Sequence, residues 1–169
     1  LGGGVVGTYM SNVGLEKAFS ELGVPFCRAK VGDRYVMEMM RSRSWMLGGE
    51  SSGHIICRDK ISTGDGIVAA LQVLEAIVLE QRSLRELCDG FEAYPQTLLN
   101  VGITSSGEDS LHRALVVEVV SKAESALNAH SESPLGRVLL RKSGTEPLVR
   151  VMVEAKQAHL SEHWAQEIA

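Results

Sequence analysis

The sequence has few aromatic residues, no excess of basic charge and no long apolar run. Only 5% of its 169 residues are aromatic and the net charge is −4, so base-stacking platforms and basic surfaces are scarce. The longest mainly apolar run, Ile67 to Leu79, contains Gln72 and Glu75 and is too short to cross a bilayer. No secretory signal pattern opens the chain. We therefore expect neither a nucleic-acid partner nor a membrane association.

Cysteine and metal-binding patterns are also sparse. The three cysteines, Cys27, Cys57 and Cys88, form no C-x-x-C pair, and their odd number favours free thiols in a reducing cytoplasm. The five histidines have no metal-ligand spacing. The stretch "STGDG" lacks the carboxylate cluster that Mg²⁺ or Ca²⁺ needs. We expect no metal site in this chain.

What is present is typical of a globular protein, with 44% hydrophobic and 22% charged residues. In the first half, apolar strands alternate with amphipathic helices, which predicts an α/β domain with a mainly parallel, mixed sheet. We expect strands at 5–10, 24–31, 45–47 and 54–57, and helices at 15–22 and 33–43.

The clearest helix is predicted within "STGDGIVAALQVLEAIVLEQ". Ser62 and Asp65 have the spacing of a capping box. Apolar residues recur on one helical face and extend to neighbouring positions, so we expect this helix to be largely buried; the face consists of Ile67, Leu71, Leu74 and Val78.

The second half has a different character. Gly90 and Pro95 interrupt the pattern, and we place a domain boundary there, with domains at 1–88 and 89–169. After this boundary we expect, in order, a strand at 97–103, a polar loop at 104–107, a helix at 111–127, two strands around a turn within 136–155 and a last helix at 160–168. This order predicts a small α+β domain with an antiparallel sheet.

Residues 48–54, "GGESSGH", form the first candidate site. Glycines permit positive φ and close ligand approach, and the carboxylate of Glu50 can accept a hydroxyl hydrogen bond on each oxygen. Ser52 and His54 add polar groups, so the loop suits the vicinal hydroxyls of a sugar. The alternative is a glycine-rich turn with Glu50 in solvent.

Residues 141–147, "RKSGTEP", form the second candidate site. Cations, hydroxyls and a glycine in one turn can bind phosphate through a guanidinium fork and backbone N–H groups. The alternative is a β-turn with exposed charges. The residues concerned are Arg141, Lys142, Ser143, Gly144 and Thr145, with Arg150 on the following strand facing either side.

A weaker candidate is "AKVGDRY", which places Lys30, Asp33 and Arg34 between a strand and a helix. A role for Asp33 as the helix N-cap is the favoured interpretation.

Longer strings carry a resemblance over almost the whole chain. They resemble the bacterial phosphoglucosamine mutase branch of the α-D-phosphohexomutase superfamily: "VVGTYMSN", "RAKVGDRYVMEMM", "LGGESSGHIIC", "TGDGIVAALQVL" and "RKSGTEPLVRVMVE". Enzymes of this family have four domains, and the resemblance implies that 1–88 is the third, sugar-binding domain and 89–169 the fourth, phosphate-binding domain. The opening "LGGG", without an initiator Met, also suggests the interior of a longer protein.

The resemblance implies roles for residues in both loops. The family's sugar-binding loop corresponds to 49–53, where Glu50 and Ser52 would hold sugar hydroxyls and Ser51 stands where this branch usually has Gln or Asn. Its phosphate-binding loop corresponds to Arg141, Ser143, Gly144 and Thr145.

The implied reaction interconverts glucosamine 6-phosphate and glucosamine 1-phosphate, which supports UDP-N-acetylglucosamine and cell-wall precursor synthesis. In this family a phosphoserine transfers the phosphoryl group, and an aspartate-rich loop holds Mg²⁺. Neither loop matches a stretch of this chain, so the resemblance implies binding roles here and N-terminal partner domains elsewhere. A phosphomannomutase or phosphoglucomutase relative and a non-catalytic phosphosugar-binding module stay open as alternatives.

Overall fold

The structure is a computed structural model that describes residues 3–103, 114–129, 136–143 and 146–169. The chain forms two compact units, Leu1–Glu92 and Ala93–Ala169. The polar loop expected at 104–107 lies outside the described residues, as do Gly144 and Thr145. Within the described ranges, no helix has both the length and the apolar character needed to cross a bilayer.

The first unit is built on a mixed sheet, sheet A, with the strand order β2-β1-β3-β4. Strand β1 pairs in parallel with β2 and β3, and β3 pairs antiparallel with β4. The predicted mixed sheet is thus confirmed. Its strands are β1 (Val5–Thr8), β2 (Phe26–Ala29), β3 (Leu47–Gly49) and β4 (Ile55–Cys57).

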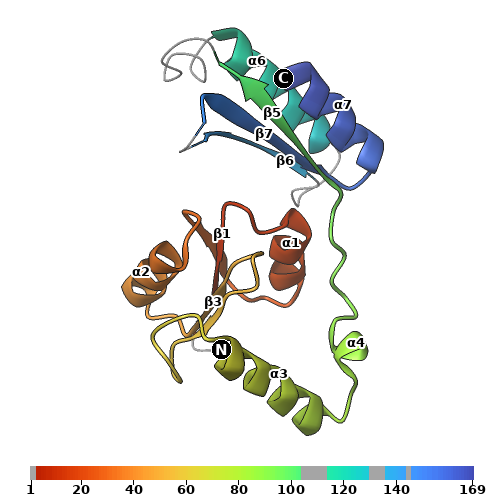
Figure 1. The fold of residues 1–169 in the computed structure, drawn as a ribbon. Coiled ribbons are helices and arrows are strands. Elements are labelled where there is room, and N and C mark those ends of the chain that lie inside the picture. Colours follow the sequence, from red (N-terminus) through yellow and green to blue (C-terminus); the bar gives the residue numbers. More distant parts are fainter. Residues whose placement is uncertain (1–2, 104–113, 130–135, 144–145) are drawn as a thin grey trace. The chain divides into compact units, whose positions relative to one another are not determined.

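Helices cover sheet A unequally. Helix α2 (Asp33–Arg43) packs on one face, where Val36 and Met40 bury against Val6 and Ile56. Helix α1 (Val13–Glu21) lies on the other side (Figure 1). Helices α3 (Gly66–Glu80) and α4 (Leu84–Leu87) follow β4 in the chain, and α3 contacts β4.

Two predictions about α3 were wrong. Its N-cap is Asp65, whose Oδ1 accepts from the N–H groups of Ile67 and Val68 at 2.8 and 3.0 Å, and the predicted capping box from Ser62 does not form. Most of the helix is exposed rather than buried, since Ala69 is its only buried residue. The sequence correctly indicates which residues share an apolar face, but this unit does not cover that face.

The second unit has a three-stranded antiparallel sheet, sheet B, in the order β5-β7-β6. Helices α6 and α7 pack on one of its faces, where Trp164 and Leu127 meet Val151 and Val153 (Figure 1). This confirms the predicted antiparallel α+β arrangement. Its elements are β5 (Gln96–Gly102), α6 (Ala114–Leu127), β6 (Gly136–Lys142), β7 (Leu148–Ala155) and α7 (Ala158–Ile168).

Candidate functional site

The parallel strands of sheet A bring three loops to one edge. Strands β1, β2 and β3 run in the same direction, so their carboxyl ends, at Thr8, Ala29 and Gly49, lie at the same edge. Ligands of open α/β sheets bind outside such edges. The loops that follow these strands contain Lys30 and Glu50, two of the residues singled out from the sequence.

Glu50 stands at the start of a tight turn. Its N–H donates to the carbonyl of His54 at 2.9 Å, and its own carbonyl accepts from Gly53 N–H at 3.0 Å. Gly53 has a φ of +96°, in the region that favours glycine. The turn therefore fixes the backbone from which the partly buried Glu50 side chain projects.

A long-range hydrogen bond orients the Glu50 carboxylate. Its Oε2 accepts from the backbone N–H of Gly32 at 3.1 Å. Among the described residues, no donor reaches the other oxygen, Oε1. One Glu50 oxygen therefore already accepts from the backbone, so we expect a sugar hydroxyl to donate to Oε1 and not to both oxygens.

Ser52 and His54 extend the polar surface of this turn. Ser52 Oγ lies 2.9 Å from Nδ1 of His54, and both residues are exposed. The hydroxyl and the imidazole hold each other in place within the turn that carries Glu50. Together these groups can donate to and accept from neutral hydroxyls.

One glycine of this loop, Gly48, has a different role from the one predicted. Gly48 and Gly49 belong to β3, and of Gly48, Gly49 and Gly53 only Gly53 has a positive φ. A Cβ on Gly48 would lie 2.7 Å from Met40 Sδ. Gly48 is therefore required for the packing of α2 on the sheet rather than for access by a ligand.

The predicted N-cap role of Asp33 was wrong. The N-cap of α2 is Gly32, with a φ of +125°, and no side chain caps this helix start. Asp33 Oδ1 instead accepts from Arg34 N–H at 2.7 Å. Sequence reasoning missed Gly32, although a glycine directly before a predicted helix was a usable signal.

Lys30 and Arg34 differ in their surroundings. Lys30 is exposed at the carboxyl edge, and its Nζ lies 5.8 Å from the ring centroid of Tyr35. Arg34 pairs with Glu38 one turn along α2 at 3.1 Å, and its side chain is 81% exposed. Lys30 thus stays near the candidate site, whereas Arg34 is engaged on the helix surface.

Arg28 is a positioning residue that the sequence did not reveal. Its Nη1 donates to the carbonyl of Thr8 at 3.1 Å, and its Nη2 pairs with Glu16 at 2.8 Å. Ser11 Oγ accepts from Thr8 N–H at 2.9 Å. These bonds hold the loop after β1 in place; the only sequence signal was a charged residue inside an apolar strand.

The second candidate loop shows an unusual pairing of charges. In the register of β6 and β7, Arg141 is directly opposite Arg150, and Lys142 is opposite Val149. Directly opposite residues project from the same face of a sheet. Arg141 and Arg150 therefore share a face, whereas Lys142 projects from the other one.

The Arg150 guanidinium is incompletely satisfied by the protein. Its Nε is buried without a hydrogen-bond partner in the part of the chain that the structure describes, and its Nη2 lies 3.9 Å from Glu146 Oε2. Ser143 N–H donates to the carbonyl of Leu148 at 2.9 Å and so closes the turn. The loop thus presents cations at one edge of sheet B.

The described residues do not fit a resident Mg²⁺ ion. They contain no group of three or more His, Cys, Asp or Glu side chains that could hold a metal.

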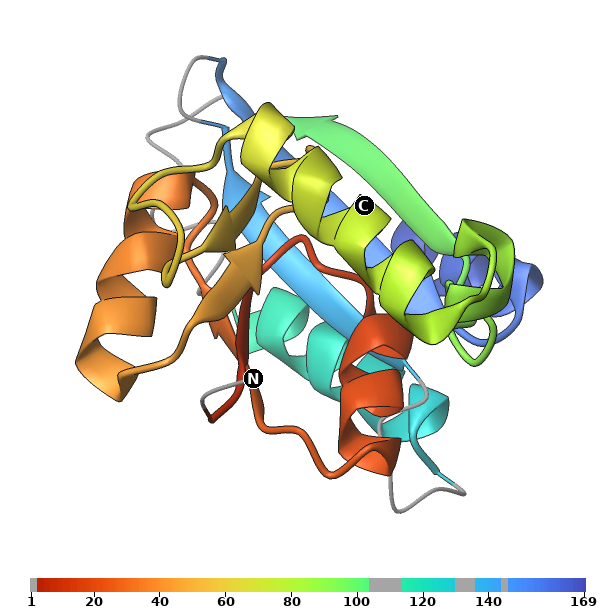
Figure 2. The same cartoon turned by 90° about the horizontal axis from the view of Figure 1, so that it is seen from below.

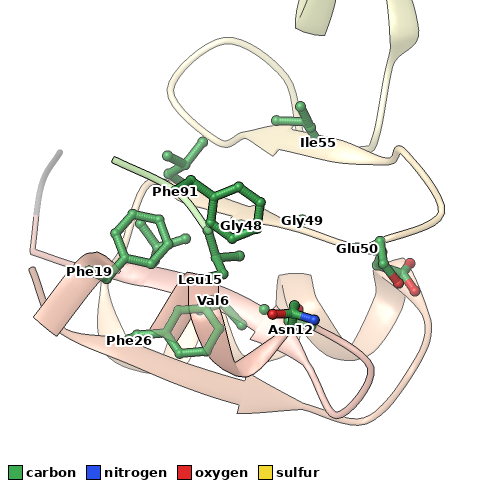
Figure 3. A pocket seen from close by; sticks show the side chains of 15 residues that line it. Val6, Asn12, Leu15, Phe19, Phe26, Gly48, Gly49, Glu50, Ile55 and Phe91 are labelled. Carbon is green, nitrogen blue, oxygen red and sulfur yellow. The ribbon is translucent and has the colours of Figure 1, made fainter. Parts of the chain in front are cut away.

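A hollow of about 380 Å³ lies on the α1 side of sheet A. Figure 3 shows Leu15, Phe19, Phe26 and Phe91 around it, with Glu50 at its margin. Sugar hydroxyls require several convergent polar groups. The mostly apolar lining makes this hollow a packing surface rather than the site of sugar recognition.

Two family models match the chain. Residues 1–94 match "Phosphoglucomutase/phosphomannomutase, alpha/beta/alpha domain III", and residues 113–169 match "Phosphoglucomutase/phosphomannomutase, C-terminal domain". All 169 residues align with the phosphoglucosamine mutases of Cronobacter sakazakii, at 53% identity, and Pseudoalteromonas atlantica, at 56%. The chain spans only 37% and 36% of those proteins, respectively.

Solved structures show the same fold. Two structures of Aspergillus fumigatus N-acetylphosphoglucosamine mutase superpose on 99% of this chain with TM-scores of 0.79 and 0.77, at 20% and 19% identity. The chain covers 38% and 41% of those chains, and the second structure is a complex with GlcNAc-6P and magnesium. At this identity the likeness concerns the fold alone. The two family-model matches show that this chain belongs to the phosphoglucomutase/phosphomannomutase family, as its domain III and its C-terminal domain.

Proposed function

We propose that these residues form the sugar- and phosphate-binding part of a longer phosphoglucosamine mutase, which interconverts glucosamine 6-phosphate and glucosamine 1-phosphate. Identities of 52–56% to bacterial phosphoglucosamine mutases support this substrate over other hexose phosphates. The chain spans about a third of those relatives, so we assign phosphoryl transfer, and the Mg²⁺ that would assist it, to the rest of the longer enzyme.

One observation carries the phosphate-binding role, namely Arg141 directly opposite Arg150 on neighbouring strands. Like charges in this arrangement destabilise a sheet, and here the Arg150 Nε has no partner among the described residues. A phosphate dianion between the two guanidinium groups would remove the repulsion and accept several charge-assisted hydrogen bonds. Ser143, Gly144 and Thr145 would add hydroxyl and backbone donors.

The sugar-binding role rests on the first loop. Glu50 Oε1 would accept from a sugar hydroxyl while Oε2 stays on Gly32, and the exposed Ser52 and His54 would contact neighbouring hydroxyls. Lys30 is an additional candidate, because it follows β2 at the same edge. Arg34, Lys142 and Asp33 are weaker candidates, since each is engaged on α2 or projects from the opposite face.

A comparison of substrates tests this function. In the longer mutase, kcat/KM for glucosamine 6-phosphate should exceed the values for mannose 6-phosphate and glucose 6-phosphate. The opposite ranking would favour a phosphomannomutase or phosphoglucomutase. Absence of turnover with all three, together with retained binding in calorimetry, would indicate a non-catalytic phosphosugar-binding module.

A further inference from the structure

Helix α3 carries an apolar stripe that its own unit leaves uncovered. Ile67, Leu71, Leu74 and Val78 recur at helical spacing and are 75%, 57%, 55% and 64% exposed. Single exposed aliphatic residues are common, but a continuous row of them on one helical face marks an interaction surface. We call these four residues the α3 stripe.

Sheet A also has an uncovered region. Helix α2 contacts β1, β2 and β3 on one face, whereas on the other face α1 packs against β2. Val5 and Leu47, from β1 and β3, line the open apolar hollow beside α1 (Figure 3). Parallel strands are normally covered by helices on both faces, and here α1 leaves the hollow over β1 and β3 open.

Helix α3 and the hollow lie on the same side of the unit. Figures 1 and 2 both show α1 and α3 on the side of sheet A opposite α2. Ile55 of β4 lines the hollow and is 39% exposed, and α3 packs against β4. An additional helix on this side could therefore cover the sheet face and contact α3.

We propose that the α3 stripe and the hollow form the docking surface for an amphipathic helix that the remainder of the longer mutase supplies. This inference rests on the proposed function, because it requires a mutase that extends beyond these residues. The occupant would bury an aliphatic stripe of its own and would carry Lys or Arg along its margin.

The length of the relatives and the composition of α3 support this occupant. This chain spans 37% of the Cronobacter relative, and the family model describes domain III as alpha/beta/alpha. Helix α3 contains Glu75 and Glu80 but no Lys or Arg. These carboxylates favour a basic partner helix, would repel each other in a pair of α3 helices, and do not suit an anionic lipid surface.

Hydrogen exchange can test the docking. We would compare the amides of residues 66–80 in the 169-residue chain and in the longer mutase at equal, low concentration. Docking should slow exchange in the longer mutase by at least about tenfold, because helix opening would first require undocking. Equal exchange rates in the two proteins would overturn the proposal.

A double variant gives a second, independent test. Leu71→Ser/Leu74→Ser should lower the Tm of the longer mutase by several degrees and leave that of the 169-residue chain nearly unchanged. The matched control is Leu22→Ser, because Leu22 is 73% exposed and belongs to neither surface. Equal shifts for the double variant in both proteins would contradict docking.

Two further measurements separate the possible explanations. Protection that appears only with dimer formation, measured by sedimentation, would make a second copy the occupant and overturn the proposal. Mutase activity of the unsubstituted longer protein is measured in parallel: turnover without α3 protection would refute the docking alone, and protection without turnover on any hexose phosphate would refute the proposed function alone.

Discussion

Strands β6 and β7 carry two cross-strand pairs of charged residues on the same face of sheet B. Arg137 is opposite Glu154, with Nε and Oε2 2.5 Å apart, and four residues further along β6 Arg141 is opposite Arg150. The Glu154 side chain is fully buried and that of Arg137 is 16% exposed. The first pair is neutralised by a close contact, whereas the second places two positive charges opposite each other, with only a 3.9 Å contact from Arg150 to Glu146.

Under the proposed function, the first pair is structural, whereas Arg141 and Arg150 would bind an anion. A buried carboxylate needs its partner permanently, because an unpaired charge in the interior is costly. Two opposed cations, by contrast, weaken the sheet until an anion arrives. Substitutions that break one pair at a time would distinguish the two roles.

Removal of the buried carboxylate should have the largest effect. Glu154→Ala leaves Arg137 without its partner, and we expect the free energy of unfolding to fall by about 3–5 kcal/mol. Urea unfolding followed by Trp164 fluorescence, in a Trp45→Phe background, measures the second unit. The control Arg137→Met/Glu154→Leu removes both charges and should cost much less; an equal loss for the control would contradict the assignment.

Arg141→Ala should mainly affect catalysis. Loss of two charge-assisted hydrogen bonds to a phosphate should reduce kcat/KM of the longer mutase about a hundredfold. Arg141→Lys should recover only part, because an ammonium group lacks the planar fork. Lys142→Ala is the matched control, since Lys142 projects from the opposite face. If Arg141→Ala kept full kcat/KM while folded, Arg141 would not bind the phosphate.

Glu50→Gln tests the proposed binding of sugar hydroxyls. The amide oxygen can still accept from Gly32 N–H, but a charge-assisted bond to a sugar hydroxyl becomes a neutral one, so kcat/KM should fall about tenfold. Ser52→Ala, which removes a neutral partner, should lose only a few-fold. Unchanged steady-state kinetics for both variants would favour the alternative, in which this loop is a solvent-exposed turn without a binding role.

The smallest effect concerns the stability of the unliganded protein. Arg150→Gln removes one of two opposed cations and should raise the free energy of unfolding in phosphate-free buffer by about 0.2–1 kcal/mol. Added inorganic phosphate should raise the Tm of the unsubstituted chain by mass action but not that of the variant. Scanning calorimetry at constant ionic strength measures both. A phosphate-dependent rise that persists in the variant would contradict the pairing.

Local sequence patterns predicted much of the fold. Helix α2 was expected at 33–43 and occupies Asp33–Arg43, because its apolar spacing and flanking residues are local signals. The small helix α4, with its capping box between Ser83 and Glu86, was missed. A helix of four residues is too short to show a period.

The rest depended on contacts between distant residues. The spacing of apolar residues correctly predicted which residues form the α3 stripe. Whether the stripe is buried depends on which other elements pack against α3, and helical periodicity does not show this. The alignment of Arg141 with Arg150 depends on the register of two strands. A shift of one residue would place the two side chains on opposite faces of the sheet. The bond from Gly32 to Glu50 joins two loops 18 residues apart, which sequence spacing alone does not connect.

That bond ties the turn that carries Glu50 to Gly32, the N-cap residue of helix α2. A ligand that drew both Glu50 oxygens to itself would leave the Gly32 N–H unsatisfied, at a cost of about 1 kcal/mol. A ligand that uses Oε1 alone avoids this loss. The Gly32 N–H would thereby favour ligands that donate one hydroxyl to Glu50 over ligands that bind both of its oxygens. The chemical shift of the Gly32 amide, measured by NMR, would distinguish these two binding modes.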